Sequence, residues 1–379
     1  MKLSPGVLTV AAYPYNLQSM RWMSRVLIVL SVFCGSLWAE NAERVKVVQI
    51  AQSGEVPDAE VGTAGDIHLA YVVGQNLYYV KSGDEGKTFS RPIRVNSEAG
   101  TVTSGKFRGP DLALGQNRQV HMIWYTTANQ RKLPKDQHGV YYSQLGPAKK
   151  AFLPSRNLNH RPSDSFSLAA DSRGTVAVFW TADGLYTNLS RDGGKTFPEA
   201  QLVHTKADPC ECCATRAHFS SKGTLFTLYR EKANNLRDMH LASQPLGEAG
   251  FSLWKISENP WKIEACPITG TFLSDGKEGG LVAAWETKGQ IYFAHLDQSG
   301  QKRSLGEIPT PGEAVKKYPV VLNAPDGTVL VAWKNRSQLE WQLYDAEGKP
   351  QGHLGQRTSR NPHRPAGVVT NEGNFLLFP

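Results

Sequence analysis

The sequence predicts an all-β protein whose short strands form a β-propeller. Gly and Pro are plentiful, with 35 and 22 residues among 379, which favours many turns over long helices. An X-Pro step opens a strand-like run about every fifty residues, which is the length of one four-stranded blade. Each run is followed by a second apolar run with an aromatic residue near its end.

Seven copies of this repeat favour seven blades. The prolines are Pro57, Pro110, Pro162, Pro209, Pro267, Pro319 and Pro365, and the aromatic residues are Tyr71, Trp124, Trp180, Tyr229, Trp285, Trp333 and Phe378. The last blade is short, and we expect Val45 to Ile50 to supply its missing outer strand. Pairing of the N- and C-terminal strands would then close the ring and cover its edges. Six blades with trimmed terminal pieces, or a two-domain β-sandwich, are the alternatives.

The N-terminal region has the features of a cleavable signal peptide. A basic stretch from Arg21 to Arg25 precedes the apolar run Val26 to Phe33, and Ala39 is a small residue suited to cleavage. The apolar run is too short to span a bilayer. We therefore expect residues 1–39 to be an upstream extension and signal peptide. Residues 40–379 would form a single propeller domain, periplasmic or secreted, with no transmembrane segment.

The charge of the chain points to anionic partners of modest size. The formal net charge is +8, a general bias towards anions. No run of Lys and Arg is long enough to indicate nucleic-acid binding. We expect a monomer that binds an acidic glycan or another small anionic ligand.

Two segments, Ser82 to Phe89 and Ser190 to Phe197, share the pattern Ser-x-Asp-x-Gly-x-Thr-Phe. Each follows a strand-like run and is typical of a hairpin turn, in which the Asp accepts backbone N–H bonds and Gly takes a positive φ. These copies resemble the Asp-box, or BNR repeat, of sialidase-type β-propellers. The resemblance implies the fold and says little about the chemistry.

Propeller geometry predicts where side chains with possible functions gather. The segments that lead into the innermost strands and the loops after the second strands share one face, around the central channel. This rule places Arg108, Arg131 and Arg230 near the segment from Cys210 to Cys213. The sequence therefore predicts a cationic mouth with sulfur atoms on one side.

The arginines also resemble the substrate-binding residues of sialidases. Phe107-Arg108-Gly109-Pro110 is similar to the family's Phe/Tyr-Arg-Ile-Pro motif, whose Arg grips a carboxylate with its planar fork. The resemblance implies that Arg108, Arg131 and Arg230 bind the carboxylate of an acidic glycan. For hydrolysis by an exo-sialidase-type glycosidase, it implies Asp136 as acid/base and Tyr318 as nucleophile, with no cofactor.

Two positions depart from the sialidase pattern. The inner strand that should carry a Glu partner for the tyrosine contains Cys212-Cys213-Ala214-Thr215-Arg216, with Glu211 displaced from the expected place. Glu286-Thr287-Lys288 stands where a third carboxylate-binding Arg is expected. Binding of acidic glycans is therefore the main hypothesis, and the departures leave hydrolysis as an additional one.

Four cysteines remain after signal cleavage: Cys210, Cys212, Cys213 and Cys266. Cys-x-Cys-Cys with Ala-Cys-Pro one blade later resembles a subset of bacterial sialidase-like propellers. Three interpretations stay open: two disulfides, a soft-metal site for Cu(I) or Zn(II), and a redox-active thiol pair. The alternative function is thus a non-catalytic propeller whose cysteine cluster binds metal or scaffolds an envelope complex.

Overall fold

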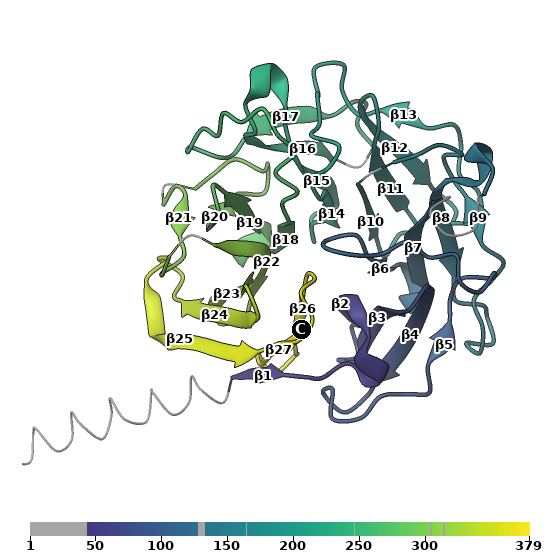
Figure 1. The fold of residues 1–379 in the computed structure, drawn as a ribbon, viewed down its shortest axis with the longest axis horizontal. Coiled ribbons are helices and arrows are strands. Elements are labelled where there is room, and N and C mark those ends of the chain that lie inside the picture. Colours follow the sequence, from purple (N-terminus) through teal and green to yellow (C-terminus); the bar gives the residue numbers. More distant parts are fainter. Residues whose placement is uncertain (1–43, 128–132, 164, 246, 304, 314) are drawn as a thin grey trace, which may run out of the picture. The chain divides into compact units, whose positions relative to one another are not determined.

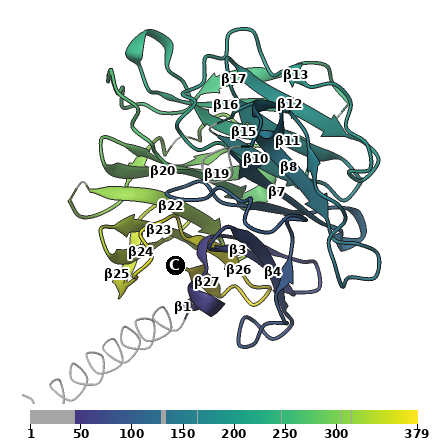
Figure 2. The ribbon, with the colours of Figure 1, turned by 45° about the vertical axis from the view of Figure 1, so that its right-hand side comes forward.

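A computed structural model describes residues 44–379, except 128–132, 164, 246, 304 and 314. The expected signal peptide and Arg131 lie outside the described residues. The described strands form seven sheets arranged as blades around a central axis (Figures 1 and 2). The prediction of an all-β propeller with seven blades is confirmed.

Six blades contain four antiparallel strands each, in chain order from the axis outward. Blade 1 comprises β2 (Glu55–Val61), β3 (Ile67–Val73), β4 (Asn76–Ser82) and β5 (Ile93–Arg94), and blade 2 comprises β6 (Asp111–Leu114), β7 (Val120–Thr126), β8 (Gly139–Gln144) and β9 (Arg156–Asn157). Blade 3 comprises β10 (Phe166–Ala170), β11 (Val176–Thr181), β12 (Leu185–Ser190) and β13 (Gln201–Leu202).

The remaining complete blades follow the same order. Blade 4 comprises β14 (Arg216–Phe219), β15 (Thr224–Arg230), β16 (Met239–Pro245) and β17 (Ser252–Lys255). Blade 5 comprises β18 (Thr271–Asp275), β19 (Leu281–Thr287), β20 (Gln290–Leu296) and β21 (Ile308–Pro309). Blade 6 comprises β22 (Lys316–Asn323), β23 (Val329–Asn335), β24 (Gln338–Tyr344) and β25 (Pro350–Thr358).

Blade 7 is closed by the two ends of the described chain. It contains β26 (Ala366–Val369), β27 (Phe375–Phe378) and β1 (Val45–Val47), and β1 lies beside β27 (Figure 1). The pairing is parallel and aligns Val45 with Phe375. The predicted closure is therefore confirmed, with a strand shorter than the sequence suggested.

The repeated aromatic residues lie in the second strand of every blade. All seven are at most 2% exposed, from Tyr71 in β3 to Phe378 in β27. Around them the core forms between adjacent blades: Leu77 of blade 1 and Trp124 of blade 2 belong to one hydrophobic cluster. Burial between sheets explains why large aromatic side chains recur at this position.

The helical elements of the described chain are five 3₁₀ turns, η1 (Ala51–Ser53), η2 (Gln116–Arg118), η3 (Lys135–Gln137), η4 (Ala233–Asn235) and η5 (Lys277–Gly279). Among the described residues, no helix has the length and apolar character needed to cross a membrane.

Candidate functional site

Segments from four blades meet over one end of the central channel. Phe107, Ala214 and Tyr318 form a small buried apolar cluster, and Ile268 packs against it. Phe107, Ala214 and Ile268 lie just before the inner strands β6, β14 and β18, and Tyr318 lies in the inner strand β22. Remote segments therefore become neighbours on this face, which we call the mouth.

Arg108 lies at the mouth in a tight loop. Gly105 and Arg108 exchange two backbone hydrogen bonds of 2.8 Å each. The Arg108 guanidinium lies 5.1 Å from the centre of the Phe107 ring, a cation–π distance. Arg108 is half-buried, so the loop holds a cation beside the apolar cluster.

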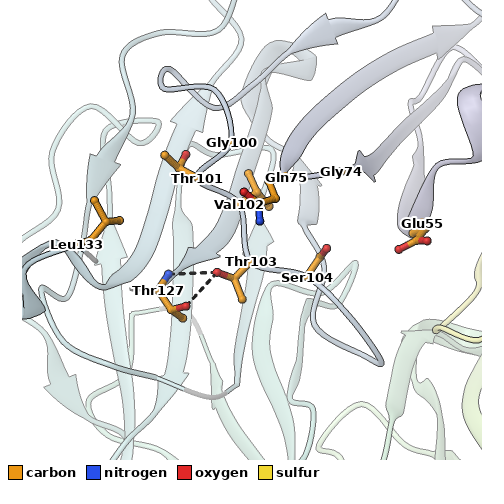
Figure 3. Close-up of a pocket in the computed structure, with 10 residues that line it drawn as sticks. All are labelled: Glu55, Gly74, Gln75, Gly100, Thr101, Val102, Thr103, Ser104, Thr127 and Leu133. Carbon is orange, nitrogen blue, oxygen red and sulfur yellow. Dashed lines mark hydrogen bonds between the residues drawn. The ribbon is translucent and has the colours of Figure 1, made fainter. Parts of the chain in front are cut away.

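A cleft of about 360 Å³ opens on the mouth face between blades 1 and 2 (Figure 3). The Thr127 backbone N–H donates to Thr103 Oγ1 at 3.2 Å, and the two hydroxyl oxygens are 3.3 Å apart. The lining comes from the β3–β4 turn, the segment before β6 and the end of β7. It consists of Glu55, Gly74, Gln75, Gly100, Thr101, Val102, Thr103, Ser104, Thr127 and Leu133. We call this space the mouth cleft.

An outer cavity of about 250 Å³ shares Thr101 and Leu133 with the mouth cleft. Its wall includes Trp124 and Tyr141, whose rings stack with centroids 6.0 Å apart. Gln137 also lines it, directly after Asp136 in the turn η3. The mouth cleft and the outer cavity together offer hydroxyl groups beside an aromatic pair.

The predicted acid/base residue Asp136 is exposed at the edge of blade 2. Its backbone carbonyl accepts a 3.4 Å hydrogen bond from Asn157 Nδ2 in the outermost strand β9. Tyr318 instead packs over the channel, in the innermost strand of blade 6. The structure thus places Asp136 beside the outer cavity and Tyr318 within the apolar cluster.

The four cysteines gather beside this cluster. Cys212 and Cys266 form a disulfide with 6.2 Å between their Cα atoms, whereas Cys210 and Cys213 are free and buried. Cys210 Sγ lies 3.5 Å from Cys213 Sγ and 3.6 Å from Cys212 Sγ. Cys210, Cys212 and Cys213 place all their sulfur atoms within 4.8 Å of one another, an arrangement compatible with a metal site.

Cys213 lies in an environment that favours its thiolate. The hydrogen bond shared with Cys210 is the main cause that lowers the pKa of Cys213 to about 6, with burial opposing it. Arg230 and the Thr269 hydroxyl, which donates to Cys213 Sγ at 3.3 Å, lower the pKa further. The same shared hydrogen bond, with burial, raises the pKa of Cys210. Within the pair, the thiolate is therefore favoured on Cys213 and disfavoured on Cys210.

Arg230 is buried beneath the cysteines and is 1% exposed. Its Nε donates to Thr269 Oγ1 at 3.0 Å, and its two Nη groups donate to the backbone carbonyls of Arg237 and Glu286. Within the described part of the chain, no carboxylate lies within salt-bridge distance of Arg230. The guanidinium is thus bonded to protein acceptors and provides positive charge under Cys213.

Glu286 in β19, which the sequence placed where a third carboxylate-binding Arg was expected, is a candidate to which sequence reasoning gave no role. It is 3% exposed, and burial raises its pKa to about 7, although Lys317 and Arg230 act in the opposite direction. Its Oε2 is buried with no hydrogen-bond partner among the described residues. Burial, and then the charge of Glu286, raise the pKa of Tyr318 to about 12. The sequence did contain a signal for Glu286. It directly follows the repeated aromatic of its blade, as Arg230 does in the blade before.

A network of buried charges connects the inner strands below the mouth. Arg216 Nη1 lies 2.9 Å from Asp58 Oδ1 and 3.8 Å from Asp111 Oδ1. Arg364 Nη2 lies 3.0 Å from the same Asp111 oxygen. In the sequence, Asp58 and Asp111 each directly follow a proline of the repeat, and this shared position was the signal for both carboxylates. These pairs balance charge across the channel, so they link blades 1, 2, 4 and 7.

No protein-family model matches the chain, and no curated protein is similar to it in sequence. Solved structures do share its fold. An ulvan lyase of polysaccharide lyase family PL25, bound to -[GlcA(1-4)Rha3S]-, is 12% identical, with a TM-score of 0.52 over 83% of this chain and 88% of that one.

Two further solved structures are similar to the chain. AofleA from Arthrobotrys oligospora is 9% identical, with a TM-score of 0.52 over 80% of this chain and 86% of that one. The intramolecular trans-sialidase from Ruminococcus gnavus is 10% identical, with a TM-score of 0.43 over 84% and 88%. At these identities, the two matches with a TM-score of 0.52 show a common fold and nothing finer.

Proposed function

We propose that this protein is an exported propeller that binds acidic glycans in the mouth cleft. The observation that carries the proposal is the cleft itself, about 360 Å³ in volume and lined mainly by hydroxyl and amide groups. This volume lies in the ordinary range for small-ligand sites. The loop that lines it from Gly100 to Ser104 continues directly to Arg108, which would bind the carboxylate.

Two further observations support a glycan as the ligand. The half-buried Tyr141 in the wall of the outer cavity, whose ring stacks on the buried Trp124, offers an apolar surface on which a sugar ring can pack. An ulvan lyase with the same fold has been seen bound to -[GlcA(1-4)Rha3S]-, a chain that carries carboxylate and sulfate groups. These two observations concern the chemical class of the ligand. The glycosidic linkage must be determined by experiment.

The binding test uses a uronate disaccharide, its neutral methyl ester and isothermal titration calorimetry. We expect Arg108→Gln to weaken binding of the acid about tenfold, which corresponds to about 1.4 kcal/mol, and to leave the ester unaffected. Arg118→Gln, in the exposed turn η2 and outside the cleft lining, is the control. Equal binding of acid and ester by the wild type would refute the acidic preference. No binding of any glycan would refute the proposal.

Hydrolysis of the sialidase type has weaker support than binding. It would need Tyr318 as nucleophile, and a phenol whose pKa is about 12 is almost entirely protonated at neutral pH. It would also need Asp136, which borders the outer cavity, as acid/base. A fluorogenic sialoside assay tests this directly. Turnover that Asp136→Asn and Tyr318→Phe both abolish would establish catalysis.

A second function is favoured by the sulfur cluster. We propose that Cys210 and Cys213 bind a soft metal ion, Cu(I) or Zn(II), because their buried sulfur atoms lie 3.5 Å apart in a cluster of three cysteines. Elemental analysis of protein purified without chelator tests it. Metal present in the wild type and lost in Cys213→Ser is the expected result, and metal-free wild-type protein that stays free of both ions after titration would exclude the site.

A further inference from the structure

The third sulfur of the cluster differs from the other two in its oxidation state. Cys212 Sγ lies 3.6 Å from Cys210 Sγ, but Cys212 is bonded to Cys266. We propose that Cys210, Cys212 and Cys213 form a three-thiolate Cu(I) site that is complete only when the Cys212–Cys266 disulfide is reduced. This inference rests on the soft-metal function proposed above.

The spacing of the sulfur atoms suits a trigonal site. A metal–thiolate distance of about 2.3 Å, at the centre of an equilateral triangle, requires sulfur atoms about 4 Å apart. Two of the observed separations are 3.5 and 3.6 Å and the third is within 4.8 Å, so small shifts of the sulfur atoms are sufficient.

The donor set selects among metals. Within the described residues, the cluster consists of three cysteines and includes no His, Asp or Glu. Cu(I) accepts a purely thiolate set, whereas Zn(II) in structural sites takes four ligands. The cluster therefore matches Cu(I) better than Zn(II).

The surroundings of the cluster stabilise the negative charge that three thiolates bring. Three thiolates and Cu(I) carry a net charge of −2, which is costly to bury without a nearby cation. The buried guanidinium of Arg230 supplies positive charge and orients Thr269, whose hydroxyl donates to Cys213 Sγ. Such hydrogen bonds to ligands are the usual support of a metal centre.

The exposure of the disulfide explains how a reductant would free the third thiol and complete the metal site. Cys266 is exposed, whereas Cys212 is 8% exposed, so a reductant reaches the Cys266 sulfur first. A dithiol attacks Cys266 Sγ as a thiolate, the Cys212–Cys266 bond breaks, and Cys212 leaves as a thiolate. The second thiol of the reductant then displaces Cys266 and closes a disulfide in the reductant. Two electrons pass to the protein, which gains two thiols.

The test measures Cu(I) affinity under anaerobic conditions by competition with a chromophoric Cu(I) chelator. It compares untreated wild type, dithiol-reduced and desalted wild type, Cys266→Ser and Cys212→Ser. The two variants lose the same disulfide, so they share its stability cost, but only Cys266→Ser keeps the third ligand. We expect reduced wild type and Cys266→Ser to bind at least about 100-fold more tightly than the other two, since even changes outside the ligand shell reach this size.

Thiol counts define the state of each sample. In protein that lacks residues 1–39, and therefore Cys34, untreated wild type should titrate two free thiols when unfolded, and the reduced protein four. A count of zero before reduction would overturn the proposal, because Cys210 and Cys213 would then be oxidised. A parallel Zn(II) titration should show no comparable gain on reduction, and an equal gain would refute the assignment to Cu(I).

The outcomes separate this inference from the function on which it rests. If Cys266→Ser binds Cu(I) no more tightly than Cys212→Ser, the third ligand and the redox control are both refuted, while binding by Cys210 and Cys213 stands. If no protein binds either metal, the soft-metal function itself is refuted.

Discussion

Thr269 connects two buried groups of opposite charge. Its hydroxyl accepts a hydrogen bond from Arg230 Nε and donates one to Cys213 Sγ. A hydroxyl can do both at once, which neither an alkyl group nor a carboxylate can. One side chain thus couples the orientation of a guanidinium to the charge of a thiolate.

Thr269→Val should raise the pKa of Cys213, because the isosteric side chain removes the donor. A hydrogen bond to a charged group contributes about 1.5 kcal/mol or more, so the midpoint of the thiolate titration, followed by ultraviolet absorbance, should rise by about one pH unit. Thr271→Val is the control, since that hydroxyl donates to the Ala284 carbonyl at 3.2 Å. An unchanged midpoint in Thr269→Val would contradict the assigned role.

Glu286 should make stability depend on pH. Its pKa is about 7 in the folded protein, compared with 4.5 for a Glu side chain in an unfolded chain. Between these values the folded protein keeps a proton that the unfolded chain has released, so the free energy of unfolding falls as pH rises through this window. The contribution of Glu286 to the free energy of unfolding is complete below about pH 4.5 and is lost above about pH 7.

Glu286→Gln removes this dependence, because the amide stays neutral. The melting temperature of the variant should match that of the wild type near pH 4 and exceed it at pH 8, with a difference in free energy of unfolding of at most about 3 kcal/mol. Glu347→Gln, at an exposed turn, is the control. A gap between Glu286→Gln and wild type that is constant from pH 4 to 8 would refute the explanation.

At the scale of elements, two loops between third and fourth strands adopt the same hydrogen-bonded turn. Asp192 Oδ1 accepts from the Thr196 backbone N–H at 2.9 Å and Oδ2 accepts from the Thr196 hydroxyl at 2.7 Å. Asp84 makes the equivalent bonds to Thr88 at 2.9 and 2.6 Å. Because the following Phe197 packs on Tyr142 of the previous blade, with ring centroids 4.9 Å apart, the turn also joins blades.

Asp192→Ala should destabilise the protein by about 1 kcal/mol, since it removes three hydrogen bonds to a carboxylate, although water can satisfy the exposed donors. Asp183→Ala is the matched control in the same blade. Asp183 is fully exposed, pairs with Arg161 and accepts a hydrogen bond from the Tyr186 hydroxyl, and the loss of such surface contacts should cost little. Chemical denaturation of both variants measures the difference, and equal costs would show that the turn has no special role.

At the scale of the molecule, stability depends on ring closure. Arg44 accepts a backbone hydrogen bond from Phe375, and the backbone N–H of Val48 donates to the Leu377 carbonyl at 2.8 Å. Without β1, the apolar strand β27 would be a free edge. The two ends of the described chain therefore form one element.

Deleting residues 1–49 should lower the melting temperature by roughly 5 to 10 °C, as expected for a loss of a few kcal/mol in a protein of this size. It should also promote aggregation through the exposed edge. Deleting residues 1–43 removes none of the described contacts and is the control. Scanning calorimetry and light scattering compare the two, and identical melting would contradict the importance of closure.

Much of the fold was predictable from sequence, because each blade repeats a local pattern. The X-Pro steps and the buried aromatics marked the strands in order, and all seven aromatics lie in second strands. The site was less predictable. Arg230 was identified as a mouth residue by its position, yet its guanidinium faces backbone carbonyls, since orientation depends on neighbours that the sequence does not reveal.

The sequence by itself determined the propeller fold, the order of the strands and the face on which the cysteines lie, since these follow from periodicity and strand alternation. It favoured seven blades, and the structure decided between seven and six. Only the tertiary structure decided which cysteines pair, that Thr269 joins Arg230 to Cys213, and that Glu286 is buried beside them. These features depend on distances between blades, and such distances are set by the packing of side chains that lie far apart along the chain.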